Sequence, residues 1–236
     1  MVEPISVAAV AGVLGAVGSG MANEAGKWAW ESAGGLVRRI AVRVADEQVA
    51  GTREAGALHA QLAHTLTELR RWDEAEAEAV AAARDERSAG HVRGHASAVE
   101  FLGLLRLRQW RFQEAYDCFE ESYAIYGRIG DDEGAADLPR ALALLDRHRG
   151  RALRGLQRRA DARELLERAL TFFRTSGEAY NTARTLTDLA ETRLDAEEFG
   201  EALPLVDEAI AALGEEKAEY HLAHLRVLRE RCVSQG

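Results

Sequence analysis

The residues best suited to metal chemistry in this chain are two closely spaced histidine pairs. His91 and His95 lie four positions apart in the segment HVRGH, and His221 and His224 lie three positions apart near the C-terminus. Either spacing would place two imidazoles on one face of a helix, where they could ligate a metal ion. Neither pair belongs to the HExxH arrangement of zinc proteases. We therefore expect polar connecting residues at both places, and no metal.

A second candidate for chemistry is the arginine-rich stretch between Arg140 and Arg159. Within it a single acidic residue, Asp146, opposes the basic side chains. Because the arginine fork matches carboxylates and phosphates, an acidic peptide or the C-terminus of a partner protein is one expected ligand. The alternative is that these arginines pair with the acidic surfaces of neighbouring helices, since the chain has abundant aspartate and glutamate. The sequence leaves both alternatives open.

The composition narrows the class of protein. The chain has 236 residues and a formal net charge of −9, which argues against a nucleic-acid binder, because such a protein needs a basic surface. Good helix formers dominate, and the acidic runs DEAEAE and DAEEFGE are expected to be solvated helix faces. Cys118 and Cys232 lie far apart without a CxxC spacing, which fits reduced thiols in a cytoplasm. No phosphate-binding loop or catalytic constellation is present, so we expect no cofactor, no catalytic residues and no enzyme.

A repeated pattern of small residues runs through most of the chain. Four segments align on Ala75, Ala115, Ala162 and Ala202, at intervals of 40, 47 and 40 residues. Further small residues lie seven positions after and twelve positions before each of these anchors: Ala82, Ser122, Ala169, Ala209, and Ala63, Gly103, Gly150 and Ala190. Small side chains at such spacings let two antiparallel helices approach closely. The pattern predicts four stacked helical hairpins.

These residues resemble the tetratricopeptide repeat. Leu102 with Gly103, Phe119 and Ser122 look like its helix signatures, and the segments RRWDEA and EEFGEA resemble its GRYEEA turn. The period is longer than the usual length of about 34 residues, and the Trp and Tyr of the first helix and the closing Pro are absent. Periods near 40 resemble the longer repeats attached to bacterial signalling ATPases and transcriptional activators. The resemblance implies an all-α fold, a right-handed superhelix of stacked antiparallel helical hairpins with an N-terminal helical extension.

The resemblance also implies a concave groove, lined by the first helix of each hairpin, that binds a peptide or a partner protein. Carried over position by position, the groove is apolar in the second hairpin, basic in the third and acidic in the fourth. The partner-binding residues expected from this transfer are Phe101, Leu104, Arg108, Arg147, His148, Arg151 and Arg154. We therefore expect a protein-protein interaction scaffold.

The N-terminal segment from Ile5 to Met21 follows a different pattern. Ala8, Gly12, Ala16 and Gly20 recur every four residues and form a row of small side chains. Such rows let helix backbones approach closely, as they do where helices pack in membranes, and the segment resembles the glycine zippers of bacterial cell-death and defence effectors. The preceding MVEP carries no basic residue, and Ala and Gly contribute little transfer energy, which argues against a signal peptide and a monomeric membrane span.

Three regions are expected from these patterns. Residues 1–50 form an Ala/Gly-rich helical segment that combines the row of small residues with a helix rich in Trp and Arg, and residues 51–216 form the four hairpins. Residues 217–236 form a capping helix, whose apolar side chains would cover the open end of the stack. The side chains expected to do so are Tyr220, Leu222, Ala223, Leu225, Val227 and Leu228.

Three functions remain open at this point. The first is a cytoplasmic adaptor that binds a peptide in its groove and whose N-terminal helices pack on the first repeat or form homo-oligomers. The second is a membrane-acting effector of a bacterial defence or signalling system, peripheral at the membrane, whose N-terminal helix inserts or oligomerises. The third is a regulatory module for a signalling ATPase or a transcription factor. We favour the first, with an acidic segment as one possible ligand.

Overall fold

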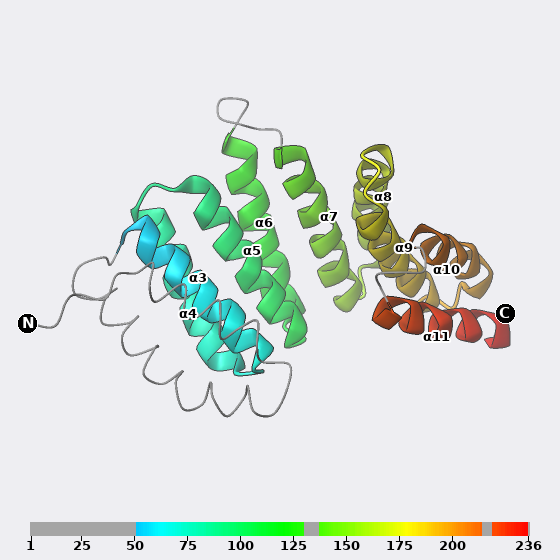
Figure 1. The fold of residues 1–236 in the computed structure, drawn as a ribbon. Coiled ribbons are helices and arrows are strands. Elements are labelled where there is room, and N and C mark those ends of the chain that lie inside the picture. The colour runs from blue at the N-terminus through cyan, green and yellow to red at the C-terminus, as the bar shows by residue number, and fades with distance from the viewer. Residues whose placement is uncertain (1–50, 130–136, 214–218, 236) are drawn as a thin grey trace, which may run out of the picture. The chain divides into compact units, whose positions relative to one another are not determined.

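The computed structural model describes residues 51–129, 137–213 and 219–235. The expected row of Ala8, Gly12, Ala16 and Gly20 lies outside these residues. All the regular elements in the described residues are helices, which confirms the predicted all-α class (Figure 1). They are α3 (Arg53–Glu68), α4 (Trp72–Ser88), α5 (Val92–Arg108), α6 (Phe112–Ile129), α7 (Leu138–Gly155), α8 (Arg159–Thr175), α9 (Ala179–Leu194), α10 (Phe199–Leu213) and α11 (Glu219–Gln235).

The described helices belong to two compact units. The first contains α3, α4, α5 and the C-terminal half of α6, and the second contains the N-terminal half of α6 and helices α7 to α11. In the first unit α3 packs on α4 and α4 on α5, and in the second each helix from α7 to α11 packs on the next. Within each unit, helices joined by a described turn run antiparallel, as the repeat pattern predicts. None of the described helices is both long and apolar enough to cross a bilayer.

Small residues lie where the helices of a hairpin come closest. The four anchor alanines, Ala75, Ala115, Ala162 and Ala202, are completely buried, which confirms their predicted place. Gly150 of α7 is the clearest case of a close approach. A β-carbon at this position would lie 2.7 Å from Cγ of Leu166 and 3.2 Å from the carbonyl oxygen of Ala162, both on α8. Helices α7 and α8 can therefore pack at this distance because position 150 has no side chain.

The turn inside each hairpin has the same backbone conformation. One residue in each turn adopts a positive φ angle, although none of the four is glycine: Arg70 (57°), Trp110 (64°), Gln157 (63°) and Glu197 (59°). Each lies five positions before an anchor alanine. In three of these turns the next residue closes the preceding helix through its backbone N–H, as Arg158 does by donating to the carbonyl of Leu153 at 2.9 Å. The hairpins therefore share a turn whose sequence differs from one repeat to the next.

The C-terminal helix α11 covers the apolar surface of α9 and α10 with a narrow face. Leu225, Leu228 and Cys232, at helical spacing, are buried in a cluster with side chains of α8, α9 and α10. Tyr220 and Val227, by contrast, are 87% and 61% exposed. Ala223 is exposed as well, so the prediction that these three residues cover the stack is wrong, because they lie outside the buried stripe of α11.

Candidate functional site

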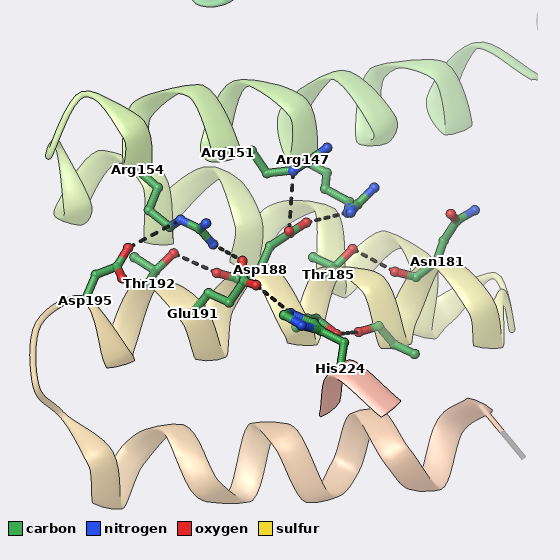
Figure 2. A network of polar contacts seen from close by, with 12 residues as sticks. Arg147, Arg151, Arg154, Asn181, Thr185, Asp188, Glu191, Thr192, Asp195 and His224 are labelled. Atoms are coloured by element: carbon green, nitrogen blue, oxygen red, sulfur yellow. Dashed lines mark hydrogen bonds and ion pairs between the residues drawn. The ribbon is translucent and has the colours of Figure 1, made fainter. Parts of the chain in front are cut away.

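Two rows of opposite charge face one another in the second unit. Arg147, Arg151 and Arg154 lie on one face of α7 at spacings of four and three residues. Opposite them on α9 is the acidic row, consisting of Asp188, Glu191 and Asp195. Figure 2 shows the arginine side chains directed toward these carboxylates. The partner of each arginine lies about one repeat later in the sequence, 37 residues for Arg154 and Glu191.

Arg147 is the most deeply placed member of the arginine row. Arg147 is 3% exposed, and its Nε atom lies 2.6 Å from Oδ2 of Asp188. Its Nη1 atom is buried without a hydrogen-bond partner among the described residues. Burial lowers the pKa of Arg147 to about 10, against the opposing effect of the Asp188 charge, and the nearby guanidinium groups of Arg184 and Arg151 lower it further. Arg147 is therefore buried beside one carboxylate and near two further guanidinium groups.

Glu191 connects three helices. Its carboxylate pairs with the guanidinium of Arg154 on α7 and lies 2.8 Å from Nε2 of His224 on α11. Burial opposes its ionisation, but the hydrogen bond from His224 and the charge of Arg154 lower the pKa of Glu191 to about 2. The same hydrogen bond raises the pKa of His224 above its ordinary value. Arg154 also lies 3.4 Å from Asp195, so this end of the row is an ion-pair network that holds α7, α9 and α11 together.

An aromatic and basic rim lies next to the acidic row. Tyr180 of α9 is 51% exposed, and the guanidinium carbon of Arg184 lies 5.4 Å from the centre of its ring. The ring of His221 on α11 approaches the same tyrosine at 5.7 Å between centroids. Arg184 has no carboxylate partner among the residues that the structure describes. Burial, followed by the charges of Arg184 and Arg147, lowers the pKa of His221, which indicates a positive field at this rim.

The first unit contains a cavity of about 330 Å³ between α3 and α5. Its floor consists of small side chains, and its wall includes the rings of His64 and Phe101, whose centroids are 5.7 Å apart. The lining residues are Ala60, His64, Ala79, Ala82, Glu86, Gly94, Ser97, Ala98 and Phe101. The volume lies at the lower end of the roughly 300 to 1,000 Å³ typical of ligand pockets. The cavity can therefore accept a large side chain.

Glu86 closes one end of this cavity. Its carboxylate forms a hydrogen bond with His91, in which Oε2 of Glu86 lies 2.5 Å from Nδ1 of His91. A side chain at Gly56 of α3 or at Gly94 of α5 would collide with the Glu86 side chain, so both glycines make room for it. A metal site at His91 and His95 was the alternative not favoured from the sequence, and the described residues contain no group of three or more potential ligands. His91 instead serves as a polar connector between α4 and α5.

A buried polar cluster in the first unit was missed by the sequence analysis. His59 of α3 lies with Nδ1 2.6 Å from Glu78 and with Nε2 3.6 Å from Asp85, both on α4. Glu78 belongs to the run DEAEAE, which was expected to be solvated, yet this residue is 5% exposed. That prediction is wrong for Glu78. The spacing of Glu78 and Asp85, seven residues apart on one helix face, is the signal that could have identified a shared buried partner.

The predicted partner-binding residues fall into two groups, one in each unit. Phe101 lines the cavity, Leu104 on the same helix is half buried, and Arg108 is exposed. In the second unit Arg147 and His148 are buried, and Arg151 and Arg154 are half buried. The sequence left open whether the arginines bind a ligand or pair with neighbouring helices. In the structure Arg147, Arg151 and Arg154 form ion pairs with carboxylates of α9. The acidic residues of α9 were expected to line the groove of the fourth hairpin, but not to pair with arginines one repeat earlier.

Comparison with known proteins agrees with this geometry. Residues 140–215 match the tetratricopeptide repeat family. A search of curated proteins found no sequence match. Among solved structures, the TPR-like repeats of a kinesin light chain candidate of Podosopora anserina superpose with a TM-score of 0.69 at 15% identity, covering 90% of this chain and 96% of that one.

Two bacterial proteins have a similar fold. BtubC (BKLC) from P. vanneervenii gives a TM-score of 0.69 at 18% identity, over 89% of this chain and 82% of that one. Aspartyl phosphate phosphatase F from Bacillus subtilis gives 0.58 at 15% identity, over 75% of this chain and 45% of that one. At these identities the likeness concerns the fold. Residues 140–215 thus match the tetratricopeptide repeat family, and the described helices have the fold of TPR-like repeats.

Proposed function

We propose that this protein is a non-enzymatic scaffold that binds a peptide segment of a partner protein along the first helices of its hairpins. The observation that supports this most directly is the cavity between α3 and α5, which is walled by His64 and Phe101. Small side chains on its floor and aromatic rings at its side suit an apolar side chain of the peptide. Leu104 and Arg108 continue the same helix beyond Phe101 and extend the proposed surface.

The acidic-peptide proposal applies to the second unit. Its support is the presence of Arg184, which has no carboxylate partner among the described residues, beside the half-buried Arg151 and the exposed ring of Tyr180. Guanidinium groups next to an aromatic ring suit a carboxylate on a peptide that also offers an apolar contact. A cytoplasmic location and self-association through Ala8, Gly12, Ala16 and Gly20 belong to the same proposal. No observation in the described residues favours the membrane effector or the regulatory module over this scaffold.

Filling the cavity tests the proposal. Peptides would be selected from a displayed library against the full chain, and their affinities measured for the chain and for Ala60→Leu, which adds a branched side chain to the cavity wall. We expect binding to weaken by about tenfold or more, because the added side chain occupies the space of the ligand. Ala57→Leu is the matched control, since Ala57 lies one turn earlier on the exposed face of α3.

Melting temperatures of both variants show whether the fold is kept. Failure to select any peptide, or equal binding by the Ala60→Leu variant and the unchanged chain, would contradict a peptide site in this cavity.

A further inference from the structure

The arginine surface of the second unit is charged beyond what its own acids neutralise. We define the arginine cluster as Arg147, Arg151, Arg154 and Arg184, which adjoins the three carboxylates of the acidic row. Arg154 is matched by Glu191 and Asp195. The remaining three arginines share a single carboxylate, that of Asp188. A further negative charge at this place would therefore be electrostatically favourable.

Asp188 is the carboxylate that contacts both Arg147 and Arg151. Its Oδ2 atom lies 2.6 Å from Nε of Arg147, and its Oδ1 atom lies 3.5 Å from Nε of Arg151. Despite these two ion pairs, four buried atoms at this site form no hydrogen bond among the described residues: Nε and Nη1 of Arg147, Nε of Arg184 and Oδ2 of Asp188. Buried donors of this kind are costly to leave unpaired. The site thus contains one carboxylate. Its unpaired N–H donors could bind a second carboxylate, or one that is better placed than Asp188.

We propose that the arginine cluster is a binding site for an acidic side chain of a peptide, and that Asp188 is a built-in competitor that keeps the site partly occupied. The inference rests on the proposed function, because it takes the ligand to be a peptide segment. An incoming carboxylate binds on the side of Arg151, whose side chain is 34% exposed, and Arg184, and the half-exposed ring of Tyr180 contacts the rest of the peptide. The repulsion between this carboxylate and Asp188 lowers the affinity of the peptide. Weakly acidic peptides therefore do not bind, and Asp188 makes the site selective for strongly acidic ones.

Neutralising the competitor is the first test. An oligoglutamate peptide would be titrated calorimetrically into the full chain and into its Asp188→Asn variant, with oligoglutamine as the uncharged control peptide. We expect Asp188→Asn to bind oligoglutamate about tenfold more tightly, because one like charge a few ångströms from the ligand has been removed. Asp207→Asn is the matched control: it changes the net charge equally, but Asp207 pairs with Arg229 on an exposed surface.

Removal of the unmatched cation is the second test, and it stays informative if Asp188→Asn destabilises the fold by leaving Arg147 without a counter-charge. Arg184→Met leaves every ion pair of the network in place and should weaken oligoglutamate binding by about tenfold. Arg174→Met, which changes an exposed pair with Glu208, is its control. Equal affinities for the chain and its Arg184→Met variant, or for the chain and a folded Asp188→Asn variant, would overturn the inference.

The imidazole of His221 reports where the peptide binds. It faces Tyr180, Arg184 and Asp188 of α9, Arg147 of α7 and His224 of its own helix. A bound carboxylate makes the field at this ring less positive, so the pKa of His221 followed by NMR should rise when oligoglutamate is added. An unchanged titration would place the bound peptide elsewhere and contradict the site.

These outcomes are separate from those that test the proposed function. Oligoglutamate has no apolar side chain, so its binding to the second unit does not depend on the cavity of the first. The Ala60→Leu variant should therefore bind oligoglutamate as the unchanged chain does. Loss of selected peptides in Ala60→Leu together with no effect of Asp188→Asn or Arg184→Met would support the scaffold and reject the built-in competitor.

Discussion

At the scale of single residues, the absence of one β-carbon allows α7 to pack on α8. Gly150→Ala should lower the free energy of unfolding by about 1 to 3 kcal/mol, because the new methyl group would collide with Leu166 and the Ala162 carbonyl. Gly127→Ala of α6 is the control, since a methyl group there meets nothing within 4 Å. It should stabilise the protein by up to about 1 kcal/mol through helix propensity. Chemical denaturation measures both, and equal effects of the two changes would contradict the close approach.

Small buried residues were predictable from the sequence, whereas buried charges were not. The anchor alanines follow from a spacing that is visible along the chain, because close helix packing tolerates few residue types. The burial of Arg147 depends on a carboxylate on another hairpin, and that of Glu78 depends on His59. An arginine or glutamate is compatible with both a solvated and a paired environment, so its type alone does not decide between them.

At the scale of helices, the attachment of α11 to α9 should depend on pH through His224 and Glu191. Because the pKa of His224 is raised, its contribution to stability is complete below the ordinary value of 6.5 and is lost as the pH rises through its raised pKa. The pKa of Glu191 is lowered from 4.5 to about 2, so its contribution is present above 4.5 and is lost as the pH falls through about 2. The contact is therefore strongest between about pH 4.5 and 6.5.

His224→Gln tests this dependence. The difference in melting temperature between the unchanged chain and this variant should be largest in mildly acidic solution and should shrink as the solution becomes alkaline. His95→Gln is a control with the opposite trend, since burial lowers the pKa of His95. A His224→Gln difference that is the same on both sides of neutral pH would show that protonation of His224 does not hold α11.

Helix positions were more predictable than helix faces. The start of α7 follows from Pro139, which fits the first turn of a helix and lies there in the structure. For α11 the apolar residues are spread around the helix, so the sequence predicts the helix without fixing which stripe is buried. Leu225, Leu228 and Cys232 form that stripe because they pack against buried apolar side chains of α8, α9 and α10.

At the scale of the whole chain, the N-terminal row of Ala8, Gly12, Ala16 and Gly20 is predicted to drive self-association. Sedimentation of the full chain and of a chain beginning at Gly51, after circular dichroism has shown that both are helical, should give a larger species for the full chain. The same measurement with liposomes distinguishes a membrane role, in which lipid binding is lost with the deletion. If removing the first 50 residues changes neither property, the predicted association through this row is wrong.

The shared turn inside the hairpins has a consequence for how such a chain can change in length. The left-handed residue keeps its distance of five positions from each anchor alanine, while the seven extra residues of the 47-residue interval lie near the junction of α6 and α7. In this chain the difference in repeat length therefore lies between hairpins, and the turns within the hairpins keep one length. A whole hairpin can be duplicated, exchanged or deleted at such a junction, and each transferred piece would carry its own turn geometry with it.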